Sequence, residues 1–268
     1  MQQSVIVEHW KEIERRENWD MIWSQHLDRY VYSEPKRAKM IQKTMEKLAV
    51  DAKTFLELGC GSLRDGGFLS RNFEVIGSDF NKKVLVQTKN VYPKCRRVVA
   101  SAFSLPFADK SVDVSFSSGL LILFNNRDAL RIIKEQVRIT RKLAVIFVHN
   151  KTNLWEIPIV KIRSVRDKLF RFRRYSRKEL HKLLKEYGKA VKIISFGTTH
   201  PFYLLSWNRY IYVPVKKLRF DQKLKKLHTT TEWCIIIDLR KSDEFIRFKL
   251  VPPERYINTR YSDSAAED

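Results

Sequence analysis

The chain has 268 residues, enough to bury a full hydrophobic core in one domain or in one domain with an appendage. Hydrophobic residues make up 44% of it, which excludes a disordered chain, and no apolar run approaches the roughly 18 residues of a membrane span. Lys and Arg outnumber Asp and Glu by 52 to 30, for a formal net charge of +22. A field of this sign attracts nucleic acid or an anionic membrane surface, but it also fits a surface that charge merely keeps soluble.

The cysteines indicate a reducing environment. Cys60, Cys95 and Cys234 are far apart in the sequence and form no C-x-x-C pair, so neither a disulfide framework nor a zinc site is indicated, and we expect no bound metal. Residues 1–20 carry acids where a signal peptide has an apolar block. We therefore expect a cytoplasmic protein that is at most peripheral at a membrane.

The first 50 residues predict a helical N-terminal extension. Apolar residues recur there near the 3.6-residue period of a helix, and a second helix follows Ser33 and Pro35. The recurring residues are Trp10, Ile13, Trp19, Ile22, Trp23 and Leu27.

Strands and helices alternate from residue 53 onward. The predicted strands are 53–58, 73–79, 95–102, 111–118, 143–149, 190–197 and 232–240. Two predicted helices begin near Asp65 and Asn81, and two longer ones cover 127–140 and 175–188. In the last of these, Ser176 and Glu179 have the spacing of a capping box. This alternation predicts an α/β fold with a seven-stranded, mostly parallel sheet and helices on both faces.

The same pattern suggests how the chain is organised. We expect a main domain over 51–241 whose core is 53–150, with basic helical insertions near the C-terminus at about 151–175 and 202–228. Residues 1–50 form the helical extension, and 242–268 form a polar tail.

The segment FLELGCGS, residues 55–62, places a glycine turn between a strand and a helix. The segment does not fit a phosphate-binding P-loop, because Gly67 and Phe68 stand where that motif has Lys and a hydroxyl residue. A dinucleotide fingerprint fits only in part, because Arg64 stands in place of its third glycine. An acid-x-G-x-G pattern from Glu57 to Gly61 fits fully, and its glycines let the backbone approach a ligand closely. We expect that ligand beyond the carboxyl end of the strand.

Four segments together resemble the class I S-adenosylmethionine-dependent methyltransferases, from about Thr54 to His149. FLELGCGS resembles the family's first motif, and VIGSD resembles its second strand, which ends in the acid that binds the ribose hydroxyls, here Asp79. SLPFADKSVDVSFSSGLL resembles the L-P-F region of the branch that methylates quinones, lipids and other small molecules. KEQVRITRKLAVIFV resembles the helix and fifth strand. The resemblance implies a Rossmann-like sheet, S-adenosylmethionine as the cofactor, and methyl transfer as the activity.

The resemblance also implies a set of cofactor-binding residues, with two departures from the family pattern. Ser101 stands where the family often carries an acid for adenine, so adenine would rely on backbone contacts, on stacking by Phe103 and on a weaker hydrogen bond to the hydroxyl. The segment TRKL replaces the usual P-G-G turn. Acids at strand ends also cap helices, which is the alternative role for Glu57 and Asp79. The implied residues are Glu57, Gly59, Cys60, Gly61, Asp79, Phe80, Ser101, Ala102, Phe103, Ser117 and Ser118.

His149 is the candidate catalytic residue. It ends the fifth predicted strand, on the substrate side, where an imidazole can act as a general base near neutral pH. The alternative is a hydrogen-bonded structural histidine.

The L-P-F branch predicts a small-molecule or lipid-like acceptor, whereas two basic segments, 161–178 and 204–227, keep an RNA methyltransferase open. A third interpretation is a non-catalytic module on the same fold that binds nucleic acid or a partner. Segment 161–178 has nine basic residues, one acid, and Ile162, Val165, Leu169 and Phe172 at helical spacing. Such a helix is typical of an anionic membrane surface, of RNA binding, or of a lid that covers the sheet or the active site.

Overall fold

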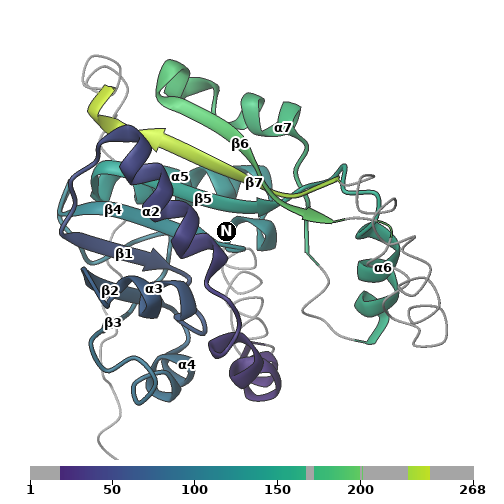
Figure 1. The fold of residues 1–268 in the computed structure, drawn as a ribbon, viewed down its shortest axis with the longest axis horizontal. Helices are drawn as coiled ribbons and strands as arrows, with labels where there is room; N and C mark the ends of the chain where they lie inside the picture. The colour runs from purple at the N-terminus through teal and green to yellow at the C-terminus, as the bar shows by residue number, and fades with distance from the viewer. Residues whose placement is uncertain (1–18, 167–171, 200, 202–228, 242–268) are drawn as a thin grey trace, which may run out of the picture.

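The computed structural model describes residues 19–166, 172–199, 201 and 229–241. They form a seven-stranded sheet with helices packed against both of its faces (Figure 1). The predicted insertion 202–228, with the basic segment 204–227 inside it, and the predicted tail 242–268 lie outside the described residues. No helix within the described ranges is long and apolar enough to cross a bilayer.

The sheet confirms the predicted α/β class. Its strand order is β3-β2-β1-β4-β5-β7-β6; β1 to β5 run parallel, and β7 runs antiparallel to both β5 and β6. Every predicted strand is present, with ends that differ from the prediction by at most three residues. The strands are β1 (Thr54–Leu58), β2 (Glu74–Asp79), β3 (Arg96–Val99), β4 (Val112–Ser118), β5 (Thr140–His149), β6 (Val191–Thr199) and β7 (Thr229–Asp238).

The helices divide into two layers, each covering one face of the sheet. Helices α2, α3 and α4 pack with Phe55, Phe116 and Phe147 on one face, whereas α5 and α7 pack with Ile146 and Ile235 on the other. Side chains alternate between the faces along each strand, so β5, with helices on both sides, is apolar and buried from Leu143 to Val148. The helices are 19–31, α2 (Lys36–Leu48), α3 (Arg64–Leu69), α4 (Lys82–Gln87), α5 (Asn126–Ile139), α6 (Ile157–Arg166) and α7 (Arg177–Leu183).

Polar caps set where three of the helices begin. Asn81 accepts the N–H groups of Lys83 and Val84 at the start of α4, and Asn125 accepts that of Asp128 at the start of α5. The predicted capping box of α7 is confirmed, because the side chains of Ser176 and Glu179 each accept the other residue's backbone N–H. After α7, a 3-10 helix (Lys185–Ala190) leads into β6.

Segment 161–178 differs from the single amphipathic helix that its spacing predicts. Helix α6 begins earlier, at Ile157, and residues 172–176 are not helical. The reason is Tyr175, whose N–H donates to the His149 carbonyl (2.9 Å) and whose own carbonyl accepts the Trp233 indole N–H (3.0 Å). Tyr175 is fully buried, so this stretch lies extended along the end of β5.

One ion pair joins α2 to the start of β7 across 195 residues of sequence. Arg37 Nε donates to Glu232 Oε2 at 3.0 Å, and a second guanidinium nitrogen donates to Oε1. The side chains are 21% and 8% exposed. Burial raises the pKa of Glu232, but the charge and hydrogen bonds of Arg37, together with smaller contributions from His149 and Arg64, hold that pKa below its usual value.

We predict that Glu232→Leu lowers the free energy of unfolding by about 3–5 kcal/mol, because it leaves a buried guanidinium without its anion. The double variant Arg37→Met with Glu232→Leu should recover most of that loss, since no buried charge is left alone. Urea denaturation measures both values. The exposed pair Lys39–Glu34 is the control, because Glu34→Leu should leave the free energy of unfolding almost unchanged. A double variant no more stable than Glu232→Leu alone would contradict this account.

Candidate functional site

The glycine turn after β1 lies at the carboxyl edge of the parallel strands. Gly59 and Gly61 have φ values of 58° and 47°, in the left-handed region that favours glycine. A Cβ on Gly59 would lie 2.8 Å from Leu120, so the space beside the turn also excludes side chains. The Cys60 N–H donates to the Ser78 carbonyl (3.0 Å), which fixes the turn against the end of β2.

Glu57 connects β1 to the start of α3. Its buried carboxylate accepts the Gly66 N–H at 2.9 Å. Burial raises the pKa of Glu57 well above its usual value, and the nearby charge of Asp65 raises it further. The carboxyl group therefore holds the helix against the strand, and it also lines the cavity described below.

Asp79 ends β2 and faces the glycine turn. One carboxylate oxygen accepts the Gly61 N–H and the other accepts the Asn81 N–H, each at 2.9 Å. Burial raises its pKa, while these N–H groups act in the opposite direction. Each oxygen keeps further acceptor capacity, which hydroxyl groups of a ligand can use.

A cavity of about 410 Å³ extends from the glycine turn and Asp79 to His149 at the end of β5. The reversal of strand order between β1 and β4 opens it, because connections leave these two strands in opposite directions. Seven of the predicted site residues line it: Glu57, Gly59, Cys60, Asp79, Phe80, Ser118 and His149.

The three residues predicted to meet adenine lie outside that lining. Ser101 is exposed, and its hydroxyl accepts the Phe103 N–H within the same turn. Phe103 packs edge-on against Phe124, with ring centroids 5.2 Å apart, and beneath the Arg131 guanidinium. Ala102 is half-buried against the same apolar cluster.

Gly61 and Ser117 are also outside the lining. A Cβ on Gly61 would lie 2.2 Å from the Trp23 ring, so the indole covers that side of the turn. Ser117 is buried on the opposite side of β4 from Ser118, where its hydroxyl donates to Gln136 at 3.4 Å.

Helix 19–31 contributes aromatic side chains to the cavity. The sequence predicted this helix but not its place at the site. Trp19 and Trp23 stack with their ring centroids 5.9 Å apart, and both line the cavity. Asp20 connects this helix to the start of α4, because it accepts the Asn81 amide N–H (2.8 Å) and pairs with Lys83. The periodic tryptophans were the available signal, but periodicity does not reveal which surface a helix covers.

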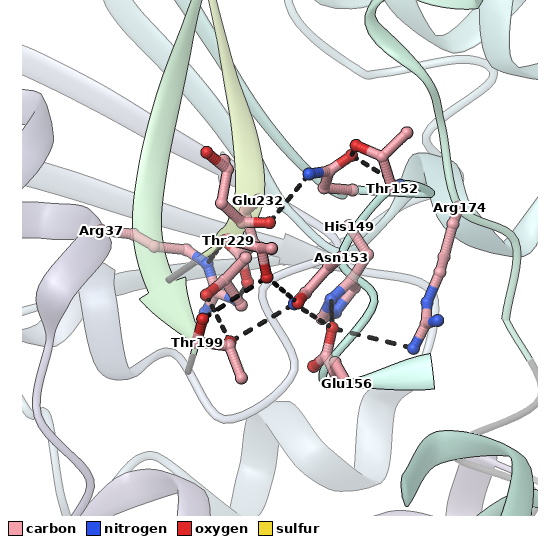
Figure 2. A network of polar contacts seen from close by, with 12 residues as sticks. Arg37, His149, Thr152, Asn153, Glu156, Arg174, Thr199, Thr229 and Glu232 are labelled. Carbon is pink, nitrogen blue, oxygen red and sulfur yellow. Dashed lines mark hydrogen bonds and ion pairs between the residues drawn. The ribbon is translucent and has the colours of Figure 1, made fainter. Parts of the chain in front are cut away.

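The opposite end of the cavity is polar and draws on segments far apart in the sequence (Figure 2). Arg37 and Glu232 come from α2 and β7, and Glu156 from the loop after β5. Glu156 accepts the Asn153 amide N–H at 3.1 Å and lies 3.7 Å from Arg174. Burial raises the pKa of Glu156 and lowers that of Arg174. Of these residues, Arg37 and Glu156 line the cavity, and the sequence pattern had singled out none of them.

His149 lies between this network and the cavity. Burial lowers the pKa of His149 to about 4, so its imidazole is neutral at pH 7. The ring stacks on Phe172, with centroids 4.4 Å apart, and its Nδ1 is 3.9 Å from Glu156 Oε2. Among the described residues, Nδ1 and the Ser118 hydroxyl are buried without a hydrogen-bond partner. A buried polar atom of this kind is expected to meet a ligand or water.

Within the described ranges, no group of three or more His, Cys, Asp or Glu side chains is placed to hold a metal ion.

Solved structures with the same fold include a S-adenosylmethionine-dependent methyltransferase from Archaeoglobus fulgidus, at 15% identity and a TM-score of 0.53, covering 75% of this chain and 94% of that one. A magnesium protoporphyrin IX methyltransferase from Synechocystis PCC 6803, with bound S-adenosylhomocysteine, has 12% identity and a TM-score of 0.57, covering 85% of this chain and 99% of that one. At such identities the likeness shows the fold.

No curated protein matches the sequence. Residues 55–142, however, match the family model described as a methyltransferase domain, and this span contains the glycine turn and Asp79. The comparisons therefore show a match to a methyltransferase domain over residues 55–142, and a fold shared with S-adenosylmethionine-dependent methyltransferases.

Proposed function

We propose that this enzyme transfers a methyl group from S-adenosylmethionine to a small-molecule or lipid-like acceptor held beside His149. The observation that carries the proposal is the single cavity that joins the glycine turn and Asp79 to the polar end around His149 and Glu156. Methyl transfer needs the donor and the acceptor in one enclosed space at close approach, and this cavity provides both ends.

The residues at the first end fit the cofactor. Gly59 has no side chain to intrude on a ligand beside the turn, Cys60 also lines this end, and Asp79 has free acceptor capacity for two ribose hydroxyls. The stacked rings of Trp19 and Trp23 line that end of the cavity. S-adenosylmethionine, when bound, supplies a methyl group that its sulfonium has already activated.

The residues at the second end suit an acceptor that must lose a proton. The neutral imidazole of His149 can take that proton at Nδ1, the ring nitrogen that has no hydrogen-bond partner among the described residues. Phe172 stacks on the ring and holds its orientation. The side chains of His149, Glu156 and Arg174 keep only 12–20% of their surface exposed, which favours a small acceptor group over a nucleic-acid strand.

An RNA acceptor remains the second candidate, supported by the net charge of +22 and by no specific contact of the described residues. A methyl-labelled cofactor separates the two. We expect label to pass to the low-mass or lipid fraction of a cell extract and to require His149. Transfer to purified tRNA or rRNA would contradict the acceptor that we propose.

We predict that saturating S-adenosylhomocysteine raises the unfolding midpoint by about 5–10 °C, as expected for ligand near a hundred times its dissociation constant. Asp79→Ala should reduce that shift to about 1 °C, because losing hydrogen bonds to a charged group weakens binding by roughly a hundredfold. Differential scanning fluorimetry measures both.

Asp113→Ala is the matched control for Asp79→Ala. Asp113 is also buried and accepts backbone N–H groups, from Lys53 and Thr54, but it lies at the start of β4, the opposite edge of the sheet. This variant should be destabilised yet keep the full ligand shift. Equal shifts in wild type and Asp79→Ala would refute the cofactor site.

We also predict that His149 makes the fold acid-sensitive. Its pKa is about 4 in the folded protein but about 6.5 when unfolded, so only the unfolded state binds a proton between these values. Stability therefore falls as the pH drops from about 6.5 to 4, by up to about 3 kcal/mol.

Urea denaturation of wild type and His149→Gln at pH 7 and pH 4.5 measures this effect, with other groups cancelling between the two proteins. The wild type should lose roughly 2–3 kcal/mol more than the variant. Equal losses would mean that His149 is not held neutral.

A further inference from the structure

Helix α6 presents apolar side chains on two opposite faces. Val160 faces inward and lines the cavity. Ile162 and Val165, three residues apart and therefore neighbours on one helix face, are 66% and 75% exposed. Leu154, in the turn before the helix, is 64% exposed. The outer face is therefore exposed and apolar, whereas a helix that merely covered the sheet would carry polar side chains on its outer face.

This outer face differs from the other exposed apolar residues of the described chain. Val86 on α4 and Val99 on β3, for example, are single aliphatic side chains on separate elements. Isolated exposures of that kind are normal in folded proteins, whereas adjacent ones at helical spacing indicate a contact surface.

Positive charge flanks the outer face. Lys161 is exposed and lies one helical turn from Val165. Residues 157–166 contain three basic residues and no acid. An aliphatic face bordered by cations matches an anionic lipid surface, into which the side chains insert while the cations meet head groups.

Two other occupants fit less well. RNA-binding surfaces use aromatic faces for stacking and polar groups for base edges, and Ile162 and Val165 supply neither. A second copy of this chain also carries a net charge of +22, so the two copies would repel each other.

We propose that the outer face of α6, formed by Ile162 and Val165 with Lys161, docks on an anionic membrane. The inner face of the same helix lines the cavity, so docking brings the acceptor end to the lipid surface. This last step rests on the proposed lipid-like acceptor, whereas docking itself does not require methyl transfer.

Cosedimentation of the full chain with vesicles of phosphatidylcholine, with and without phosphatidylglycerol, tests the proposal. We expect binding only to vesicles that contain phosphatidylglycerol, and weaker binding as salt is added. Ile162→Ser with Val165→Ser should lower the partition coefficient by about tenfold or more, because two inserted aliphatic side chains are lost. Lys161→Glu should lower it by about tenfold through charge reversal.

The double variant Val86→Ser with Val99→Ser is the matched control, since it removes two exposed valines elsewhere and should bind vesicles like the wild type. Unfolding midpoints and ligand shifts with S-adenosylhomocysteine, measured in solution, should be unchanged in all these variants. This readout separates failed docking from failed cofactor binding. The proposal is overturned if the wild type does not bind anionic vesicles, or if Ile162→Ser with Val165→Ser binds them as well as the wild type does. It is also overturned if bulk RNA displaces the protein from the vesicles and binds the wild type and Ile162→Ser with Val165→Ser equally well.

Discussion

The site depends on one topological constraint, the reversal of strand order between β1 and β4. Five parallel strands end at the same edge of the sheet, and the connections from β1 and β4 diverge there, leaving space that no backbone crosses. The glycine turn, Asp79 and His149 all project from strand ends at this edge. Functional residues can meet at this edge because side chains from separate strands converge there, although they are far apart in the sequence.

Buried charge around this edge is balanced in pairs, and the balance sets the state of His149. Glu232 is held ionised by Arg37, while Arg174 lies near Glu156 without a hydrogen bond between them. Negative charge from Glu232 favours a protonated imidazole, but burial together with the cations Arg37 and Arg174 outweighs it. The histidine stays neutral, the form that a proton acceptor needs. The same balance makes the junction between α2, β5 and β7 sensitive to single substitutions.

Sequence reasoning predicted the sheet well, because each strand carries an apolar pattern bounded by turn residues, as in 143–149 and 232–240. It also located the glycine turn and Asp79, whose spacing is a local property. It could not place Trp23 over Gly61, or bring Arg37 and Glu156 to the cavity, because these contacts arise from tertiary packing. The prediction of one helix over 161–178 was wrong, because the buried Tyr175 is hydrogen-bonded to β5 and β7, and these contacts outweigh the local periodicity.

A crystal structure of the full chain with S-adenosylhomocysteine would test the central claim most directly. We predict electron density for the ligand inside the cavity, with the ribose hydroxyls donating to Asp79, the amino-acid portion against Gly59 and Cys60, and the sulfur facing the His149 end. Trp19 and Trp23 should close over it. Ligand bound away from the glycine turn, or a cavity that stays empty at saturating ligand, would contradict the account.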